Sequence, residues 1–417
     1  MKIAIVGGGA AGLVTAHLLH NHHDVTIFEK DAVLGGHVKT LGGNVPCPDL
    51  PPGQHLDSGV VEFDRLHFPR FHALMAELDV DMAPVNITSG LFQADGSSWH
   101  APERLKLEYP SLVRRAVETP RHLPLLAARK RFLARVDDVP SSNLLAYRLD
   151  EFLDDDVFGV WLKMLLMYAY SIPFEQTGAI GAVLAIPMLR RFVHGSDWTR
   201  VVGGVWTYME TILSGLDATV RTGSPVESIS RSENGVDVAV RGERPSRFDA
   251  VVFAATPDQV LSILDDADDD EKRRFCAWGS NIAQTLVHTD TALYERRGIH
   301  YHSEFDLFET ENGAHGYNAH LNRLAGLGDG PPHFNLAYGI DEEIDPNKVV
   351  HLQSFTTPAY TVEPLRWREE VIATNGHRNT WYAGAWLGDG LHEGAVVSAE
   401  RVSEGLGGRT IGTLLGE

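Results

Sequence analysis

The stretch KIAIVGGGAAG, residues 2–12, decides the fold of this chain. Its apolar first half is typical of a buried parallel strand, and its glycines match the pattern G-x-G-x-x-G. A helical pattern follows over Leu13–His20, and a second predicted strand, Asp24–Phe28, ends at Glu29. This acid lies 22 residues after Gly7, close to the spacing at which a carboxylate accepts ribose hydroxyls. The order of strand, glycines, helix, strand and acid predicts a Rossmann unit that binds a dinucleotide.

Each glycine of the motif has its own physical task. Gly7 permits a tight turn, Gly9 lets the backbone approach a pyrophosphate, and Gly12 allows close packing of helix on strand. The N-terminus of the helix offers free N–H groups and a partial positive charge to the phosphates. The residues that we expect to bind the dinucleotide in this part of the chain are Gly7, Gly9, Ala10, Ala11, Gly12, Glu29 and Lys30.

A second glycine pair, Gly35-Gly36-His37, follows the acid. This spacing resembles the E-x-x-x-x-x-G-G-R element of the flavin amine oxidase superfamily. Other segments resemble motifs of the same superfamily in the same order: His55–Val61, Gly203–Trp206, Ser224–Ile229, Asp249–Pro257, Trp381–Trp386 and Gly390–Ala395. The resemblance extends over nearly the whole chain, and the bacterial predicted NAD/FAD-binding proteins are the most similar subgroup.

The resemblance implies an α/β fold, in which a Rossmann-type FAD-binding domain carries an inserted mixed α+β substrate domain. It assigns residues 1–65, 200–270 and 375–417 to the FAD domain and residues 66–199 and 271–374 to the substrate domain. It implies FAD as the cofactor, and binding is expected to be non-covalent because neither cysteine lies in a flavin-proximal motif. The further cofactor-binding residues that it implies are Gly35, Gly36, His37, Ser58, Gly59, Val60, Val226, Ala254, Gly384, His392, Glu393, Gly394 and Ala395.

The chain departs from the superfamily pattern at three places. His37 replaces the usual arginine, and Trp386 stands where many amine oxidases have a cofactor-binding acid. Glu393 is a candidate to replace that contact. No lysine matches the one beside the flavin N5, since Lys348 is the only lysine in the last hundred residues and begins a predicted strand. These departures leave amine oxidation open.

Three functions are compatible with this pattern. The first is an FAD-dependent oxidoreductase that removes hydride from a small or lipid-like substrate, by amine oxidation or desaturation. The second is a redox-neutral double-bond isomerase of an unsaturated fatty acid, and the third is a non-catalytic binding protein. The intact glycines argue against the third, because a lost cofactor would remove the reason for them. His392 is the candidate catalytic residue, and a packing role is its alternative.

The composition favours a soluble, cytoplasmic enzyme. The net charge of −20 disfavours nucleic-acid binding. Cys47 and Cys276 are isolated, which fits a reducing compartment. No apolar run approaches the roughly 20 residues needed to span a bilayer. No histidine motif predicts a metal site, and a second G-x-G-x-x-G motif for a nicotinamide is absent.

The first insertion reads as mostly helical, with apolar spacing over Phe71–Leu78, Leu112–Val117, Leu123–Val136, Leu144–Leu153 and Val157–Tyr170. Seven basic residues gather in it: Arg114, Arg115, Arg121, Arg129, Lys130, Arg131 and Arg135. They could contact a membrane surface or a substrate carboxylate, or form an ordinary solvated helix face. Trp161, Met164, Leu165, Met167, Tyr168 and Tyr170 could line an apolar substrate tunnel or pack in the core.

Overall fold

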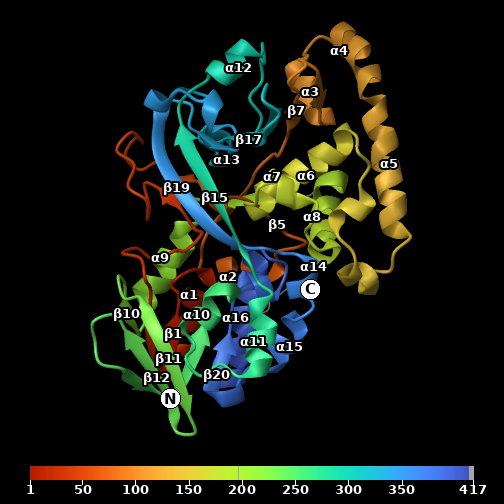
Figure 1. Cartoon of the computed structure of the whole chain (residues 1–417). Coiled ribbons are helices and arrows are strands. Elements are labelled where there is room, and N and C mark those ends of the chain that lie inside the picture. The colour runs from red at the N-terminus through yellow and green to blue at the C-terminus, as the bar shows by residue number, and fades with distance from the viewer. Residues whose placement is uncertain (196, 413–417) are drawn as a thin grey trace.

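The strand β1 (Lys2–Val6) lies in the middle of a five-stranded sheet in the computed structural model, which describes residues 1–195 and 197–412 (Figure 1). The order of this sheet is β10 (Thr219–Arg221), β2 (Asp24–Phe28), β1, β14 (Ala250–Phe253) and β20 (Thr380–Tyr382). All neighbouring strands run parallel. Every strand comes from the segments that the sequence assigns to the FAD domain, so distant parts of the chain build one sheet.

Helices pack against this parallel sheet, and their apolar faces form its core. Helix α1 (Ala10–Leu19) begins directly after the glycines, three residues before the predicted start, and packs beside α16 (His392–Leu406) (Figure 1). The other elements of this region are α9 (Trp206–Gly215), β11 (Val226–Ser232), β12 (Gly235–Val240), β13 (Ser246–Phe248), α10 (Pro257–Ile263), α11 (Asp269–Cys276) and α15 (Arg368–Ala373). The strands β11, β12 and β13 form a separate antiparallel sheet.

The two insertions share a seven-stranded sheet. Its order is β19 (Val349–Pro358), β15 (Ser280–His288), β18 (Asn335–Tyr338), β17 (His315–His320), β16 (Phe305–Glu309), β7 (Gly90–Phe92) and β8 (Ser98–His100). The pairing of β16 with β7 is parallel, whereas the other neighbours are antiparallel. The sequence did not predict β7 and β8, because a strand of three residues is too short to show alternation.

Helices of the first insertion cover one side of this sheet at the upper right of Figure 1. They are α3 (Pro102–Glu108), α4 (Leu112–Glu118), α5 (Leu123–Asp137), α6 (Val157–Tyr170), α7 (Phe174–Thr177) and α8 (Ala182–His194). Helix α2 (Pro69–Glu77) instead packs against α16, near the centre of Figure 1. The sequence missed α8, which contains Pro187, a residue that normally interrupts a helix. The shorter elements are β3 (Thr40–Leu41), β4 (Leu56–Asp57), β5 (Phe63–Asp64), β6 (Met82–Pro84), β9 (Trp198–Val201), α12 (Ala292–Arg296), α13 (Leu321–Leu324) and α14 (Val362–Leu365).

The predicted helix over Leu144–Leu153 is wrong. Two short 3₁₀ turns, Ser141–Ala146 and Leu149–Phe152, replace it, and Arg148 between them is extended. The N–H of Leu149 donates to the carbonyl of Ile180 at 2.9 Å, so pairing with a distant segment overrides the local helical pattern.

The apolar residues of α6 lie in the core, which favours the packing role over a substrate tunnel. Trp161, Met164, Leu165, Met167 and Tyr170 are all buried in one continuous cluster. Only Tyr168 among the six residues proposed for a tunnel is partly accessible. In the part of the chain that the structure describes, no helix is long and apolar enough to cross a membrane.

Candidate cofactor and substrate site

The glycines after β1 differ in what constrains them. A Cβ atom on Gly7 would lie 2.5 Å from the carbonyl oxygen of Ala254, and one on Gly12 would overlap the carbonyl oxygen of Gly7. Protein packing therefore explains these two glycines. A Cβ on Gly9 would lie 3.6 Å from its nearest neighbour, the Cα of Gly36, and its φ of −83° suits any residue. Gly9 has no reason within the protein to be glycine, which is expected if a phosphate approaches its backbone.

The N-terminus of α1 fits an anionic ligand. Gly9 is its N-cap, and no side chain caps the first turn. The first N–H groups of a helix need an acceptor, and a phosphate supplies one. Ala10 and Ala11 begin this turn, where the sequence placed the phosphates. The donor set therefore fits the pyrophosphate of a dinucleotide.

Glu29 lies at the carboxyl end of β2 and is tied to the glycine turn. One carboxylate oxygen accepts the N–H of Gly8 at 2.7 Å, and the other accepts the N–H of Asp31 at 2.9 Å. The N–H of Ser224 donates to the Glu29 carbonyl at 2.8 Å, which brings the start of β11, Val226, toward the same end of the sheet. Lys30 is exposed beside it. The glycine turn, the acid at the end of β2 and the predicted segment Ser224–Ile229 thus meet at this end of the sheet.

The loop of Gly35 and Gly36 lies on the glycine turn, as expected for two loops that enclose one ligand. The N–H of Gly35 donates to the carbonyl of Gly8 at 2.9 Å, and Gly35 pairs with Gly9. Gly35 has a φ of +125° and Gly36 a φ of +56°, a region that favours glycine. The amide of Asn44 holds the base of this loop through carbonyls on either side of Gly35.

His37 does not replace the missing arginine as a cation. Its Nε2 lies 3.0 Å from the carbonyl oxygen of Thr356, and its ring meets Phe355 edge-on at 5.5 Å between centroids. Desolvation lowers the pKa of His37 below its usual range although its side chain is exposed, so the ring is neutral near pH 7. His37 therefore connects the glycine loop to β19 and adds no positive charge for a phosphate.

The segment around Ser58 joins several motifs. Asp57 accepts hydrogen bonds from the Thr40 hydroxyl at 2.5 Å and from the N–H of Val205 at 2.9 Å. The N–H of Ser58 donates to the Lys39 carbonyl at 2.8 Å. A Cβ on Gly59 would overlap the His37 carbonyl oxygen, so this segment passes as close to the second glycine loop as a backbone can. Val60 follows directly, and the predicted flavin segment is thereby fixed against the cofactor loops.

Glu62 and Tyr168 form a polar pair that the sequence did not predict. The Tyr168 hydroxyl, on α6, donates to Glu62 Oε2 at 2.9 Å. Phe305 stacks on the Tyr168 ring at 4.7 Å, and Tyr317 meets it edge-on at 5.1 Å. Desolvation raises the pKa of Glu62 to about 7, although its side chain is partly accessible. This combination is expected of a side chain that lines an internal space.

The pair was missed because its signal is weak. Glu62 stands three residues after Gly59, so the resemblance already places it beside the flavin segment. Tyr168 appeared only as one member of an apolar helix. No sequence spacing connects the two residues, since they are 106 positions apart.

His392 has the surroundings of a packing residue. Its ring lies against Phe63, Phe71 and Tyr208, at 4.9 to 5.6 Å between centroids. Its Nε2 forms a hydrogen bond with the Tyr208 hydroxyl at 2.8 Å. Burial lowers the pKa of His392 to about 3. The geometry therefore favours the packing role, with a tyrosine as the partner.

Glu393 caps a neighbouring helix. Its two carboxylate oxygens accept the N–H groups of Arg70 and Phe71, both at 2.9 Å, at the start of α2. The Glu393 carboxylate is therefore directed at α2. It does not replace the cofactor-binding acid that many amine oxidases have at the position of Trp386. The Trp386 indole N–H instead donates to the Ala255 carbonyl at 3.3 Å.

The N–H groups expected at the start of α16 are engaged within the protein. The N–H of Gly394 donates to Asp389 Oδ1 at 2.9 Å, and the N–H of Ala395 donates to the Leu391 carbonyl at 3.3 Å. Gly384 ends the loop after β20, and its N–H donates to the Ser398 hydroxyl at 2.8 Å. Gly394 and Ala395 are predicted cofactor-binding residues, but the N–H groups of both already have acceptors within the protein.

A buried charge cluster lies close to this turn. The Arg191 guanidinium, on α8, lies 3.8 Å from Asp389 and 3.9 Å from Asp64. Its Nε and Nη1 find no hydrogen-bond partner among the described residues. Desolvation raises the pKa of Asp389. Among residues 1–195 and 197–412, no group of three or more His, Cys, Asp or Glu side chains could hold a metal ion.

Comparison with known proteins agrees with this geometry. The family of flavin containing amine oxidoreductases matches residues 10–275. No curated protein sequence matches the chain significantly. Putrescine oxidase bound to putrescine shares the fold at 14% identity, with a TM-score of 0.67 over 97% of this chain and 99% of the other. Cyclohexylamine oxidase from Brevibacterium oxydans IH-35A shares the fold at 16% identity, with a TM-score of 0.66 over 97% of this chain and 99% of the other. The CLA-producing fatty acid isomerase from P. acnes shares the fold at 17% identity, with a TM-score of 0.69 over 97% of each chain.

Proposed function

This chain belongs to the family of flavin-containing amine oxidoreductases, and we propose that it is an FAD-dependent enzyme that removes hydride from a C–H bond of a small organic substrate. The observation that supports this proposal is the Glu62–Tyr168 pair. Directly after the predicted flavin segment, it holds a carboxyl group on a tyrosine whose ring packs against Phe305 and Tyr317. When bound, FAD supplies the hydride acceptor at its N5 atom. The protein supplies binding, orientation and a water-poor site.

We propose that FAD binds non-covalently in the FAD domain, residues 1–65, 200–270 and 375–417. The N-terminus of α1 and the backbone of Gly9 would hold the pyrophosphate, because this helix end lacks a capping side chain and Gly9 lacks a packing constraint. Glu29 would accept the ribose hydroxyls at the end of β2. Residues 66–199 and 271–374 would then form the substrate domain.

Glu62 would bind the substrate through its carboxyl group. In its ionised form it attracts a protonated amine, and in its neutral form it donates a hydrogen bond. Tyr168 orients the carboxyl group, and the Phe305 and Tyr317 rings give the site an apolar wall. An amine therefore fits this arrangement better than a long hydrocarbon, because the remaining apolar residues of α6 are packed in the core.

The experiment has two steps. First, the purified protein is examined by visible spectroscopy before and after denaturation, and the released compound is identified by mass. Release of intact FAD supports the cofactor assignment, whereas a protein that is colourless and takes up no added FAD contradicts it. Second, the bound flavin is mixed anaerobically with panels of amines and of unsaturated fatty acids. Bleaching by amines in the wild type, with loss in Glu62→Gln, supports oxidation at this site. Double-bond migration in a fatty acid without oxygen consumption would instead favour the isomerase.

A further inference from the structure

Helix α4 exposes apolar side chains that none of the residues described by the structure covers. None of its residues is buried. Leu112, Val113 and Val117 are 76%, 77% and 60% exposed. A short helix without tertiary packing gains little stability by itself, so a surface of this kind points to an external contact.

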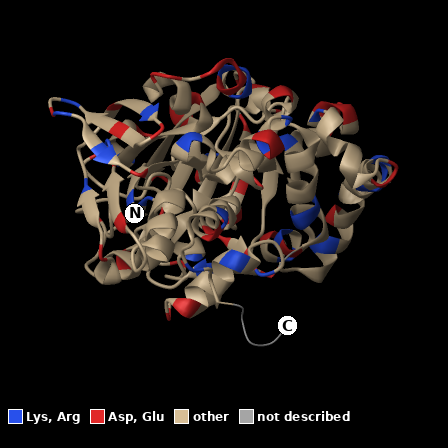
Figure 2. Ribbon diagram, turned by 90° about the horizontal axis from the view of Figure 1, so that it is seen from below, with Lys and Arg blue, Asp and Glu red and all other residues tan. Residues whose placement is uncertain are grey.

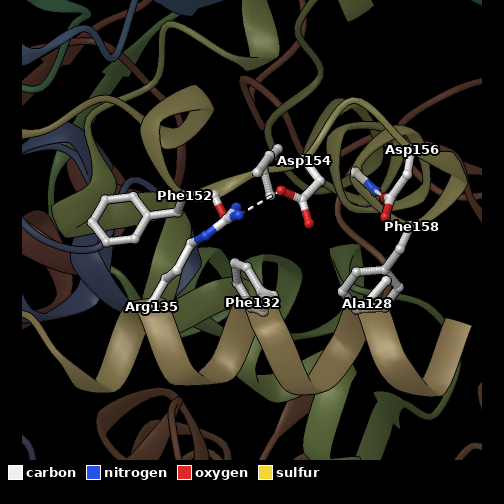
Figure 3. Close-up of a pocket in the computed structure, with 9 residues that line it drawn as sticks. Ala128, Phe132, Arg135, Phe152, Asp154, Asp156 and Phe158 are labelled. Carbon is white, nitrogen blue, oxygen red and sulfur yellow. Dashed lines mark hydrogen bonds and ion pairs between the residues drawn. The ribbon is translucent and has the colours of Figure 1, made fainter.

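Exposed apolar side chains continue along the chain into α5. Leu123 and Leu126 are each 57% exposed, whereas Ala128 and Phe132 are buried on the opposite side of the same helix. Figure 3 shows this inner side, with Ala128, Phe132 and Arg135 directed toward the segment that contains Asp154. The helix is therefore fixed by one face, and its other face, which carries the leucines, is free.

Positive charge surrounds these apolar side chains. Residues 111–134 contain six arginines and lysines but one acid, Glu118, in a chain whose net charge is −20. Arg131 and Arg135 form ion pairs within the protein, with Asp154 at 2.8 and 2.5 Å. Arg114, Arg129 and Lys130 form no ion pair with the residues that the structure describes. Figure 2 shows several basic segments on the helices toward its right-hand side, where some acidic segments also lie.

We propose that the outer face of α4 and α5, here called the α4–α5 face, docks on the surface of an anionic phospholipid bilayer. Aliphatic side chains ringed by arginine and lysine are the composition of interfacial helices, in which apolar groups enter the acyl boundary and cations meet the headgroups. A nucleic acid would use the cations but leave Val113 and Leu123 unpartnered. The contact is peripheral, and it does not depend on the reaction at Glu62.

The test is co-sedimentation of the flavin-loaded protein with vesicles. One set is pure phosphatidylcholine, and the other contains about one third phosphatidylglycerol. The wild type is expected to sediment with the anionic vesicles only. Each cation near such a surface strengthens binding about fivefold, so Arg114→Glu combined with Lys130→Glu should weaken binding by at least ~25-fold. Val113→Asp combined with Val117→Asp should weaken it more than about tenfold.

The controls separate docking from folding and from self-association. Leu66→Asp removes an apolar side chain that is 79% exposed and belongs to neither α4 nor α5, and the variant should bind vesicles like the wild type. All variants should keep the wild-type flavin content, since α4 contributes nothing to the core. Equal binding of wild type and V113D/V117D would overturn the proposal. So would a wild-type dimer that V113D/V117D converts to a monomer in the absence of lipid, because the face would then be a self-interface.

Discussion

Replacing Glu62 by glutamine should make the protein more stable at high pH. Desolvation raises the pKa of Glu62 from 4.5 to about 7 in the folded state. Below pH 4.5 the carboxyl is protonated in both states and contributes no difference. Between pH 4.5 and 7 the unfolded chain loses this proton while the folded chain keeps it, so the folded wild type loses stability as pH rises. At about 1.4 kcal/mol per pKa unit, the full loss is about 3 kcal/mol above pH 7.

The assay is urea unfolding of the wild type and Glu62→Gln at pH 5 and pH 8, at equal flavin content. Glutamine does not titrate, so the variant should gain about 2.5 kcal/mol over the wild type between these two pH values. Asp57 and Glu393 also have raised pKa values, of about 7, but both proteins contain them and their effects cancel. Tyr168→Phe removes a hydrogen-bond donor that favours the ionised form of Glu62. The pKa of Glu62 should therefore rise further, and the loss of stability between pH 5 and pH 8 should be larger than in the wild type. An identical stability difference at pH 5 and pH 8 would refute the reasoning.

Further predictions concern the cofactor loop, the histidine and a buried ion cluster. Gly9→Ala should keep the wild-type fold by circular dichroism but lose FAD in an affinity titration, whereas Gly12→Ala should fail to fold, because its methyl would overlap the Gly7 carbonyl. His392→Gln should keep kcat within about threefold, since general acid–base catalysis lost at this position would cost about 100-fold or more; a loss of that size would restore His392 as the catalytic residue. Arg104→Met should cost about 3–5 kcal/mol of unfolding free energy in urea, because it leaves the fully buried Asp306 without its cation; a change below about 1 kcal/mol would contradict this.

The sequence predicts the cofactor side of this molecule better than the substrate side, for a physical reason. A dinucleotide is held mainly by backbone, so its loops need glycine where a Cβ would collide, as at Gly12 and Gly59. Such steric demands leave a readable pattern. The Glu62–Tyr168 pair instead depends on where α6 packs, and any polar residue at position 62 would fit the local chain. Local patterns also misled the prediction over residues 144–153, where distant hydrogen bonds decide the backbone.

The charge of Glu62 connects the site's environment to the choice of substrate. A carboxyl with a pKa of about 7 is divided between both forms at neutral pH, so a ligand can shift it in either direction. An ammonium group within about 4–6 Å favours the ionised form and lowers the pKa, whereas an apolar ligand that expels water raises it. The same residue thus binds amines more tightly as pH rises through 7, and hydrocarbon substrates more tightly as pH falls. The Tyr168 hydroxyl stabilises the ionised form, but desolvation of Glu62 outweighs it and raises the pKa to about 7, so both forms are available to a ligand. The carboxyl held by Tyr168 is therefore the feature by which we propose that the site selects amines, even without a lysine beside the flavin.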